Sequence, residues 1–165
     1  MNISLIGMPG CGKSALGRGL ALVLKRPFYD CDKRVERQSG MSVAQIFEKG
    51  AEGAFRELEV LCIRECAGFE NAVIATGGGA VLDGRNMEAL KENGVIVFIN
   101  RPIEYILKDI ETQNRPLLKG GKERLRLLYD QRLPLYKKYA DIEILNDSTK
   151  DDALKRIRQA VLRVR

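Results

Sequence analysis

The chain of 165 residues is 45% hydrophobic and 30% charged, with a formal net charge of +6. This length suits a single domain over residues 1–165 that buries its core without disulfides or metal ions. No apolar run approaches the roughly 20 residues of a membrane span, and the absence of histidine excludes mechanisms that need an imidazole base. Carboxylates, lysines and arginines must therefore carry any acid–base or electrostatic chemistry.

The amino-terminal sequence and the cysteines predict a cytoplasmic protein. The opening MNISLIG enters a β-branched apolar run without the charged and long apolar regions of a secretory signal. The cysteines show no C-x-x-C spacing, and without histidine a zinc site would need an unusual ligand set. We interpret the four as reduced thiols that fill small spaces: Cys11, Cys31, Cys62 and Cys66.

Short apolar runs alternate with longer segments of helical periodicity. The runs cover residues 3–6, 28–29, 72–75, 95–99 and 142–145. This alternation is typical of an α/β fold in which helices cover both faces of a parallel sheet. Helix punctuation agrees with it, since Ser42 is placed to cap a helix over 42–49.

A phosphate-binding motif follows the first apolar run directly. Residues 7–14, GMPGCGKS, satisfy G-x-x-x-x-G-K-[ST] and precede a helical stretch over 15–24. In such a loop the backbone N–H groups and the helix N-terminus face the phosphates, the lysine bridges the β- and γ-phosphate oxygens, and the serine can bind Mg²⁺. We assign ATP to Gly10, Cys11, Gly12, Lys13, Ser14 and Ala15. A glycine-rich turn without a ligand is the alternative.

Two aspartates, Asp30 and Asp32, follow the second apolar run, at the edge of the sheet where open α/β folds bind ligands. Because residues two apart on a strand point to the same side, both carboxylates are expected to face the phosphate loop. No apolar run ends in the aspartate of a usual Walker B motif. We therefore predict that Asp30 holds Mg²⁺ through water and that Asp32 binds, or deprotonates, the acceptor hydroxyl. A turn with solvated acids remains the alternative.

The third apolar run ends in Thr76 and three glycines, Gly77, Gly78 and Gly79. Glycines allow a ligand to approach the backbone and accept hydrogen bonds from its N–H groups. We predict substrate contacts here, although a tight turn would also explain the motif.

Three arginines stand in settings that suggest anion capture: Arg56, Arg115 and Arg132. The arginine fork donates two parallel hydrogen bonds to a carboxylate or phosphate, yet most arginines are simply surface residues. Arg115 belongs to a basic segment, about residues 112–122, in which proline and paired glycines interrupt the helical pattern. We predict that this segment is a mobile lid.

The last segment, 150–165, has the pattern of an amphipathic helix with a basic outer face. Basic charge permits weak RNA association, but the segment has no aromatic residue for base stacking. We therefore expect no nucleic-acid partner.

In this order the motifs resemble those of shikimate kinase: the phosphate loop, Asp-x-Asp, Phe-Arg-x-x-Glu, Thr-Gly-Gly-Gly, Arg-Pro-Leu-Leu and Arg-x-Pro-Leu-Tyr. The resemblance spans nearly the whole chain. It implies a five-stranded parallel sheet of the nucleoside-monophosphate-kinase type, a helical substrate-binding region at about 33–59, and a lid that closes over ATP. The implied reaction converts shikimate and ATP to shikimate 3-phosphate and ADP.

The resemblance also implies roles for individual residues. Lys13 and Ser14 would contact ATP and Mg²⁺, and Asp32 the reacting hydroxyl. Arg56 and Arg132 would bind the shikimate carboxylate. The backbone N–H of Gly78 would bind the substrate, and Arg115 would reach the ATP phosphates with the lid. We expect a monomer that binds ATP and shikimate and contacts neither membrane nor nucleic acid. The alternatives are another small-molecule kinase of this fold, such as gluconate kinase, and a non-catalytic nucleotide- or RNA-binding module.

Overall fold

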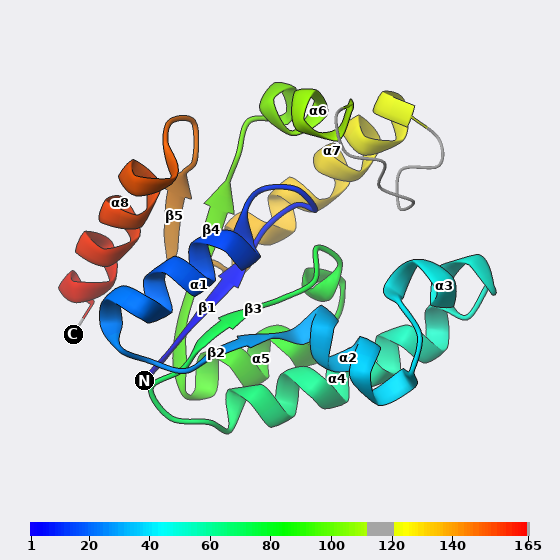
Figure 1. Cartoon of the computed structure of the whole chain (residues 1–165), viewed down its shortest axis with the longest axis horizontal. Coiled ribbons are helices and arrows are strands. Elements are labelled where there is room, and N and C mark those ends of the chain that lie inside the picture. The colour runs from blue at the N-terminus through cyan, green and yellow to red at the C-terminus, as the bar shows by residue number, and fades with distance from the viewer. Residues whose placement is uncertain (112–120, 165) are drawn as a thin grey trace.

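A computed structural model describes residues 1–111 and 121–164 (Figure 1). Five strands form one sheet in the order β2-β3-β1-β4-β5, and every neighbouring pair is parallel. The strands are β1 (Asn2–Ile6), β2 (Phe28–Asp30), β3 (Val73–Ala75), β4 (Gly94–Asn100) and β5 (Ile142–Leu145). These strands confirm the predicted five-stranded α/β fold, and their bounds follow the five apolar runs closely.

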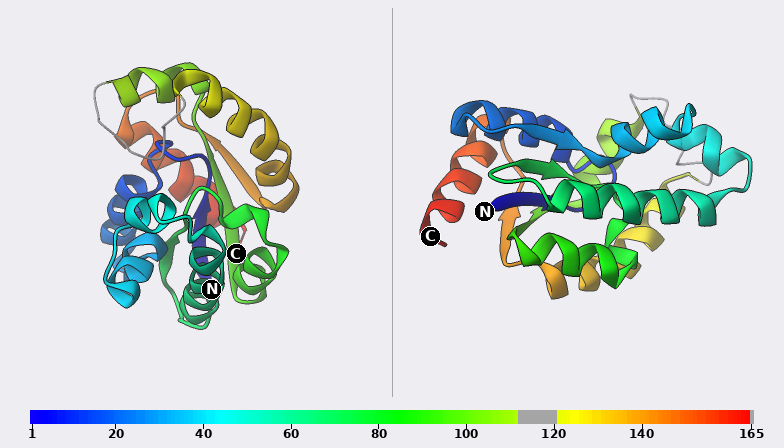
Figure 2. Two further views of the ribbon diagram at one scale, coloured as in Figure 1. Left: turned by 90° about the vertical axis from the view of Figure 1, so that its right-hand side faces the viewer. Right: turned by 90° about the horizontal axis from the view of Figure 1, so that it is seen from below.

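Helices cover both faces of the sheet, as predicted (Figure 2). They are α1 (Lys13–Leu24), α2 (Cys31–Ser39), α3 (Val43–Glu48), α4 (Glu52–Ala67), the 3₁₀ helix η1 (Ala80–Leu82), α5 (Gly84–Glu92), α6 (Ile103–Glu111), α7 (Gly121–Tyr139) and α8 (Lys150–Arg163). Helices α1 and α8 pack together on one face, whereas α5 and α7 lie on the other. None of the helices in the described part of the chain is both long and apolar enough to cross a membrane.

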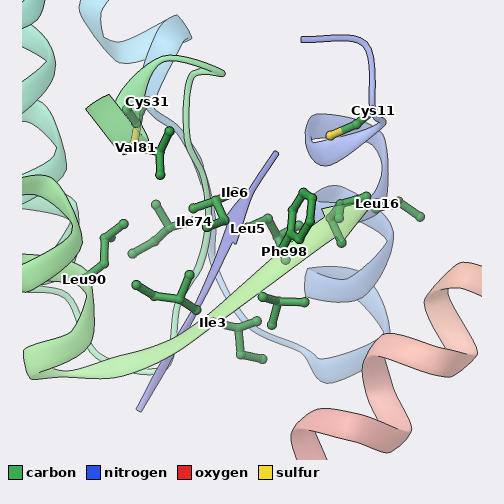
Figure 3. Close-up of a cluster of buried hydrophobic side chains, with 14 of the residues drawn as sticks. Ile3, Leu5, Ile6, Cys11, Leu16, Cys31, Ile74, Val81, Leu90 and Phe98 are labelled. Atoms are coloured by element: carbon green, nitrogen blue, oxygen red, sulfur yellow. The ribbon is translucent and has the colours of Figure 1, made fainter. Parts of the chain in front are cut away.

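The core surrounds the two central strands, β1 and β4. All five residues of β1 are buried, because a parallel strand covered on both faces has no side open to water. Leu16 of α1 and Leu90 of α5 reach this core from opposite faces (Figure 3). The layers thus fix the carboxyl ends of β1, β2 and β3 at one edge of the sheet, where the predicted site residues lie.

Capping residues in the sequence fix where the helices beside this edge begin and end. Ser42 accepts a hydrogen bond from the Gln45 N–H while the Gln45 side chain bonds back to the Ser42 N–H, which is a complete capping box at the start of α3. Helix α2 ends at Ser39 and is capped by Gly40, whose φ of 68° is in the left-handed region. The region 33–59 is therefore helical, as predicted, and consists of most of α2, all of α3 and the first half of α4.

Candidate active site

The phosphate loop connects β1 to α1 and depends on glycine at two of its positions. Gly7 has φ +146°, and a Cβ there would lie 2.7 Å from the carbonyl oxygen of Ile99. Gly12, with φ +99°, caps α1 in a conformation that other residues rarely adopt. The loop thus leads into the N-terminus of α1, where free N–H groups and the helix dipole favour an anion.

Lys13 is buried, and its ammonium is held by the loop itself. The Nζ atom donates to the carbonyl oxygens of Gly7 and Met8, each at 2.8 Å. The loop is also tied to the last strand, because Asn146 Nδ2 donates to the Cys11 carbonyl at 2.9 Å. Asn146 was not among the predicted site residues. Its place directly after β5, at the carboxyl edge of the sheet, is the signal that could have identified it.

Ser14 and Asp30, both assigned to the metal from sequence, lie together. Ser14 Oγ donates to Asp30 Oδ2 at 2.7 Å. The other carboxylate oxygen, Oδ1, accepts from the Lys33 N–H at 3.2 Å and so caps α2. A hydroxyl and a carboxylate in contact form the kind of oxygen pair that Mg²⁺ accepts.

Asp32 does not lie on an extended strand, so this part of the prediction is wrong. Strand β2 ends at Asp30, and Cys31 already belongs to α2. Capping by Asp30 turns the chain into a helix at once, so Asp32 lies in the first helical turn. Asp32 still lines the cavity at the phosphate loop, together with Lys13 and Ser14.

Asp32 stands between two cavities. One is lined by the phosphate loop and the start of α1, and the other by α3, α4, the glycine triplet and α7. Pro9, Asp32 and Gly78 line both. Burial and, to a smaller extent, the nearby charge of Glu59 raise the pKa of Asp32 to about 6, against the opposing charge of Lys13.

The second cavity, which we call the acceptor cleft, contains two of the predicted arginines. Its lining comprises Pro9, Asp32, Val43, Phe47, Glu52, Phe55, Arg56, Glu59, Gly77, Gly78, Gly79, Arg124, Leu125, Leu128 and Arg132. Arg56 Nη1 donates to Glu59 Oε2 at 2.8 Å, and its Nη2 lies 3.4 Å from Glu52 Oε1. Burial raises the pKa of Glu59, and Arg56 and Arg132 oppose that rise. The positive charges of two arginines thus act on one buried carboxylate.

The glycine triplet lies against side chains of this cleft. A Cβ on Gly77 would lie 2.6 Å from Asp32 Oδ1 and 2.7 Å from Glu59 Oε1. One on Gly79 would overlap the Arg56 guanidinium, 2.5 Å from Nη1. The close approach predicted from the glycines is therefore made by the protein's own charged groups, and contact with a ligand stays a prediction.

Tyr136 of α7 fixes the middle of the triplet. Its hydroxyl donates to the Gly78 carbonyl at 2.6 Å, and its ring stacks on Phe98 with centroids 5.1 Å apart. Neither Tyr136 nor Glu59 received a role from the sequence, although each closes one of the motifs quoted above. Arg115 and most of the predicted lid, 112–122, lie outside the described residues; Gly121 and Lys122 begin α7.

This phosphate loop and carboxylate-bearing cleft, on a three-layer α/β fold, define a P-loop phosphotransferase. The shikimate kinase family model matches residues 9–162, and the chain belongs to the shikimate kinase family. Among relatives, it is 42% identical to the shikimate kinase of Clostridium botulinum (strain Alaska E43 / Type E3) over 97% of this chain and 96% of that one. It is 45% identical to that of Pelotomaculum thermopropionicum over 82% and 80% of the two chains.

Solved structures agree with the family. Shikimate kinase from Acinetobacter baumannii in complex with shikimate superposes with a TM-score of 0.93 at 37% identity, covering 99% of this chain and 94% of that chain. Shikimate kinase from Aquifex aeolicus superposes with a TM-score of 0.84 at 37% identity, covering 97% of this chain and 95% of that chain. A gluconokinase from Sinorhizobium meliloti shares the fold, with a TM-score of 0.60 at 14% identity.

Proposed function

We propose that this member of the shikimate kinase family transfers the γ-phosphoryl group of ATP to the 3-hydroxyl of shikimate, giving shikimate 3-phosphate and ADP. One observation carries the proposal. Asp32 lies where the phosphate-loop cavity and the arginine-lined acceptor cleft meet. A hydroxyl held there faces the phosphate loop, which is the arrangement that in-line transfer needs.

The phosphate loop binds the nucleotide in this proposal. Backbone N–H groups of residues 10–15 bind the phosphates, and Lys13 exchanges its two carbonyl partners for phosphate oxygens. Mg²⁺ would be held by Ser14 and, through water, by Asp30, and it would supply neutralising charge at the phosphates. The contact between these two side chains supports the assignment.

The acceptor cleft binds the substrate carboxylate through Arg56 and Arg132. The Arg56 guanidinium is already oriented by Glu59, so this side chain loses little freedom on binding. Backbone N–H groups of the triplet 77–79 contribute further hydrogen bonds, with Gly78 held by Tyr136. A small anionic polyol fits the combination of Arg56 and Arg132 for its carboxylate, Asp32 for a hydroxyl, and backbone donors.

Asp32 accepts a hydrogen bond from the reacting hydroxyl. With a pKa of about 6 it is mostly ionised at neutral pH and can take the proton as the new bond to phosphorus forms. Since phosphoryl transfer has a loose transition state, positioning by Asp32 contributes more than its basicity. Arg115 completes the proposal by joining the ATP phosphates when residues 112–122 close and exclude water.

We further propose that the enzyme acts as a monomer in the cytoplasm and needs no nucleic acid. The residues assigned to ATP and to the acceptor all belong to this chain, so the proposed reaction needs no residue from a second copy. All four cysteines are free thiols, which suits a reducing compartment.

The test is an ADP-release assay with Mg·ATP and a panel of shikimate, gluconate and nucleoside monophosphates. Release that depends on shikimate supports the proposal. Release with gluconate or a nucleoside monophosphate, but not with shikimate, would contradict the acceptor and leave the nucleotide site intact. Nucleotide binding without turnover for any acceptor would indicate a binding module.

A further inference from the structure

Three cysteines that the phosphoryl-transfer mechanism does not use form a buried cluster. The sulfur atoms of Cys31, Cys62 and Cys66 all lie within 4.8 Å of one another, and each residue is 0% exposed. Cys31 begins α2, whereas Cys62 and Cys66 lie one turn apart on α4. The cluster lies inside the interface between these two helices, which pack directly against each other. Free Cys11 lies outside it, in the phosphate loop.

The spacing suits a shared metal ion. A Zn²⁺ ion sits about 2.3 Å from each thiolate sulfur, which places three such sulfurs about 3.8–4.0 Å apart. The separations in the cluster, at most 4.8 Å, reach this range with small side-chain rotations. Thiolate ligands select thiophilic ions over Mg²⁺, which prefers oxygen. The cluster is therefore chemically distinct from the Ser14–Asp30 pair.

Arg34 supplies positive charge beside the cluster. Its guanidinium interacts electrostatically with the Cys62 and Cys66 thiols and lies over the rings of Tyr29 and Phe69, at 5.8 and 5.7 Å from their centroids. Among the described residues its Nε is buried without a hydrogen-bond partner, although another nitrogen pairs with Glu65. A buried donor without an acceptor costs free energy, and a metal-bound thiolate would supply an acceptor.

We propose that Cys31, Cys62 and Cys66 form a binding site for one thiophilic divalent cation of the Zn²⁺ type. The three thiols lose their protons on binding and become the protein ligands, while a non-protein ligand fills the fourth position. Three thiolates and a divalent ion carry one net negative charge, which faces Arg34. The site is separate from the nucleotide and acceptor cavities, neither of which any of these three cysteines lines.

The test uses reduced full-length protein titrated with Cd²⁺, which substitutes for Zn²⁺ and gives a thiolate-to-metal charge-transfer band in the ultraviolet. We expect one ion per chain, undiminished by a large excess of Mg²⁺. Cys62→Ser and Cys66→Ser should each weaken binding by at least about tenfold, because loss of even an outer-shell partner of a metal ligand typically costs that much. The matched control is Cys11→Ser, which should bind Cd²⁺ as the unmodified chain does.

Two further measurements distinguish loss of the metal site from slow entry of the ion or failure to fold. Refolding in the presence of Cd²⁺ covers slow entry of the ion into a buried site, and near-ultraviolet circular dichroism shows whether each serine variant folds. Retention of the band in folded Cys62→Ser and Cys66→Ser, or its loss in folded Cys11→Ser, would overturn the proposal. So would the absence of any band after refolding with Cd²⁺, which would leave the cluster as core packing.

Discussion

The two halves of the active site are built in opposite ways. The phosphate loop is one contiguous segment, 7–14, that works mainly through its backbone and depends on glycines at Gly7 and Gly12. The acceptor cleft is assembled from side chains of α2, α3, α4, α7 and the triplet 77–79. Backbone recognition depends little on side chains, whereas the cleft depends on the relative placement of distant elements. Mutations should therefore affect the binding of ATP and of the acceptor separately. The exception is the shared wall, by which we mean the residues that line both cavities: Pro9, Asp32 and Gly78.

The largest effect is expected at the shared wall itself. Asp32→Asn keeps the shape but removes the charged acceptor that both positions the hydroxyl and takes its proton, and we expect kcat to fall by about 10²–10⁴ while the KM for ATP changes little. Asp151→Asn, an exposed substitution on α8, is the matched control. Steady-state kinetics with both substrates measure the effect. An unchanged kcat would remove Asp32 from the mechanism.

The next largest effect should change the KM for one substrate and not for the other. Gly79→Ala places a Cβ against the Arg56 guanidinium, and loss of one charge-assisted hydrogen bond, about 1.5–3 kcal/mol, predicts a rise of roughly 10- to 100-fold in the KM for shikimate. The KM for ATP should stay the same. Gly53→Ala is the control, since nothing lies within 4 Å of its Cβ. Equal increases for both substrates would contradict the division into two halves.

The pH dependence of kcat tests the role of Asp32 in the shared wall. Because the pKa of Asp32 is about 6 in the folded protein, kcat should decline as the pH falls through about 6. The charge of Glu59 contributes to that raised pKa, so Glu59→Gln should move the acidic limb to lower pH. Profiles of kcat against pH for both proteins measure the shift. A limb that stays at the same pH would exclude this coupling.

The Asp32 carboxyl also makes the stability of the fold depend on pH. The folded pKa of Asp32 exceeds the unfolded one, so between about 4 and 6 the folded state binds more protons than the unfolded state. This group therefore makes the free energy of unfolding fall as the pH rises through that window and adds no further change above it. Denaturant unfolding of Asp32→Asn should lack this contribution. An unaltered pH dependence in the variant would contradict it.

The smallest effect compares two helix caps. Ser42→Ala and Thr149→Ala each remove an N-cap hydrogen bond and should lower the free energy of unfolding by about 1 kcal/mol. Helix α3 carries Val43 and Phe47 into the acceptor cleft. Only Ser42→Ala should therefore raise the KM for shikimate, by a few-fold. A matching rise in Thr149→Ala would show that general destabilisation is the cause.

The sequence predicted best what is encoded locally. The five apolar runs and the G-x-x-x-x-G-K-[ST] spacing gave the sheet, its helical layers and the phosphate loop, because each depends on neighbouring residues. The strand position of Asp32 was wrong because side-chain capping by Asp30 ends β2 one residue after Tyr29. That capping bond could not be distinguished from a strand end by spacing.

Partners that are distant in the sequence could not be deduced from spacing. The pairing of Arg56 with Glu59 is local, but the approach of both to the triplet depends on how α4 packs beside β3. Asn146 reaches Cys11 across 135 positions of the chain, and no pattern in the sequence connects them. The role of Arg115 remains a prediction, since it lies outside the described residues.

The two hydrogen bonds from Lys13 to the carbonyls of Gly7 and Met8 have a consequence for how nucleotide affinity is measured. The loop supplies its own lysine with two internal partners. An arriving phosphate competes with these carbonyls and receives only the difference between the two sets of bonds. The measured affinity for ATP then includes the loss of the two carbonyl bonds, so removal of the lysine would understate the strength of its contact with phosphate.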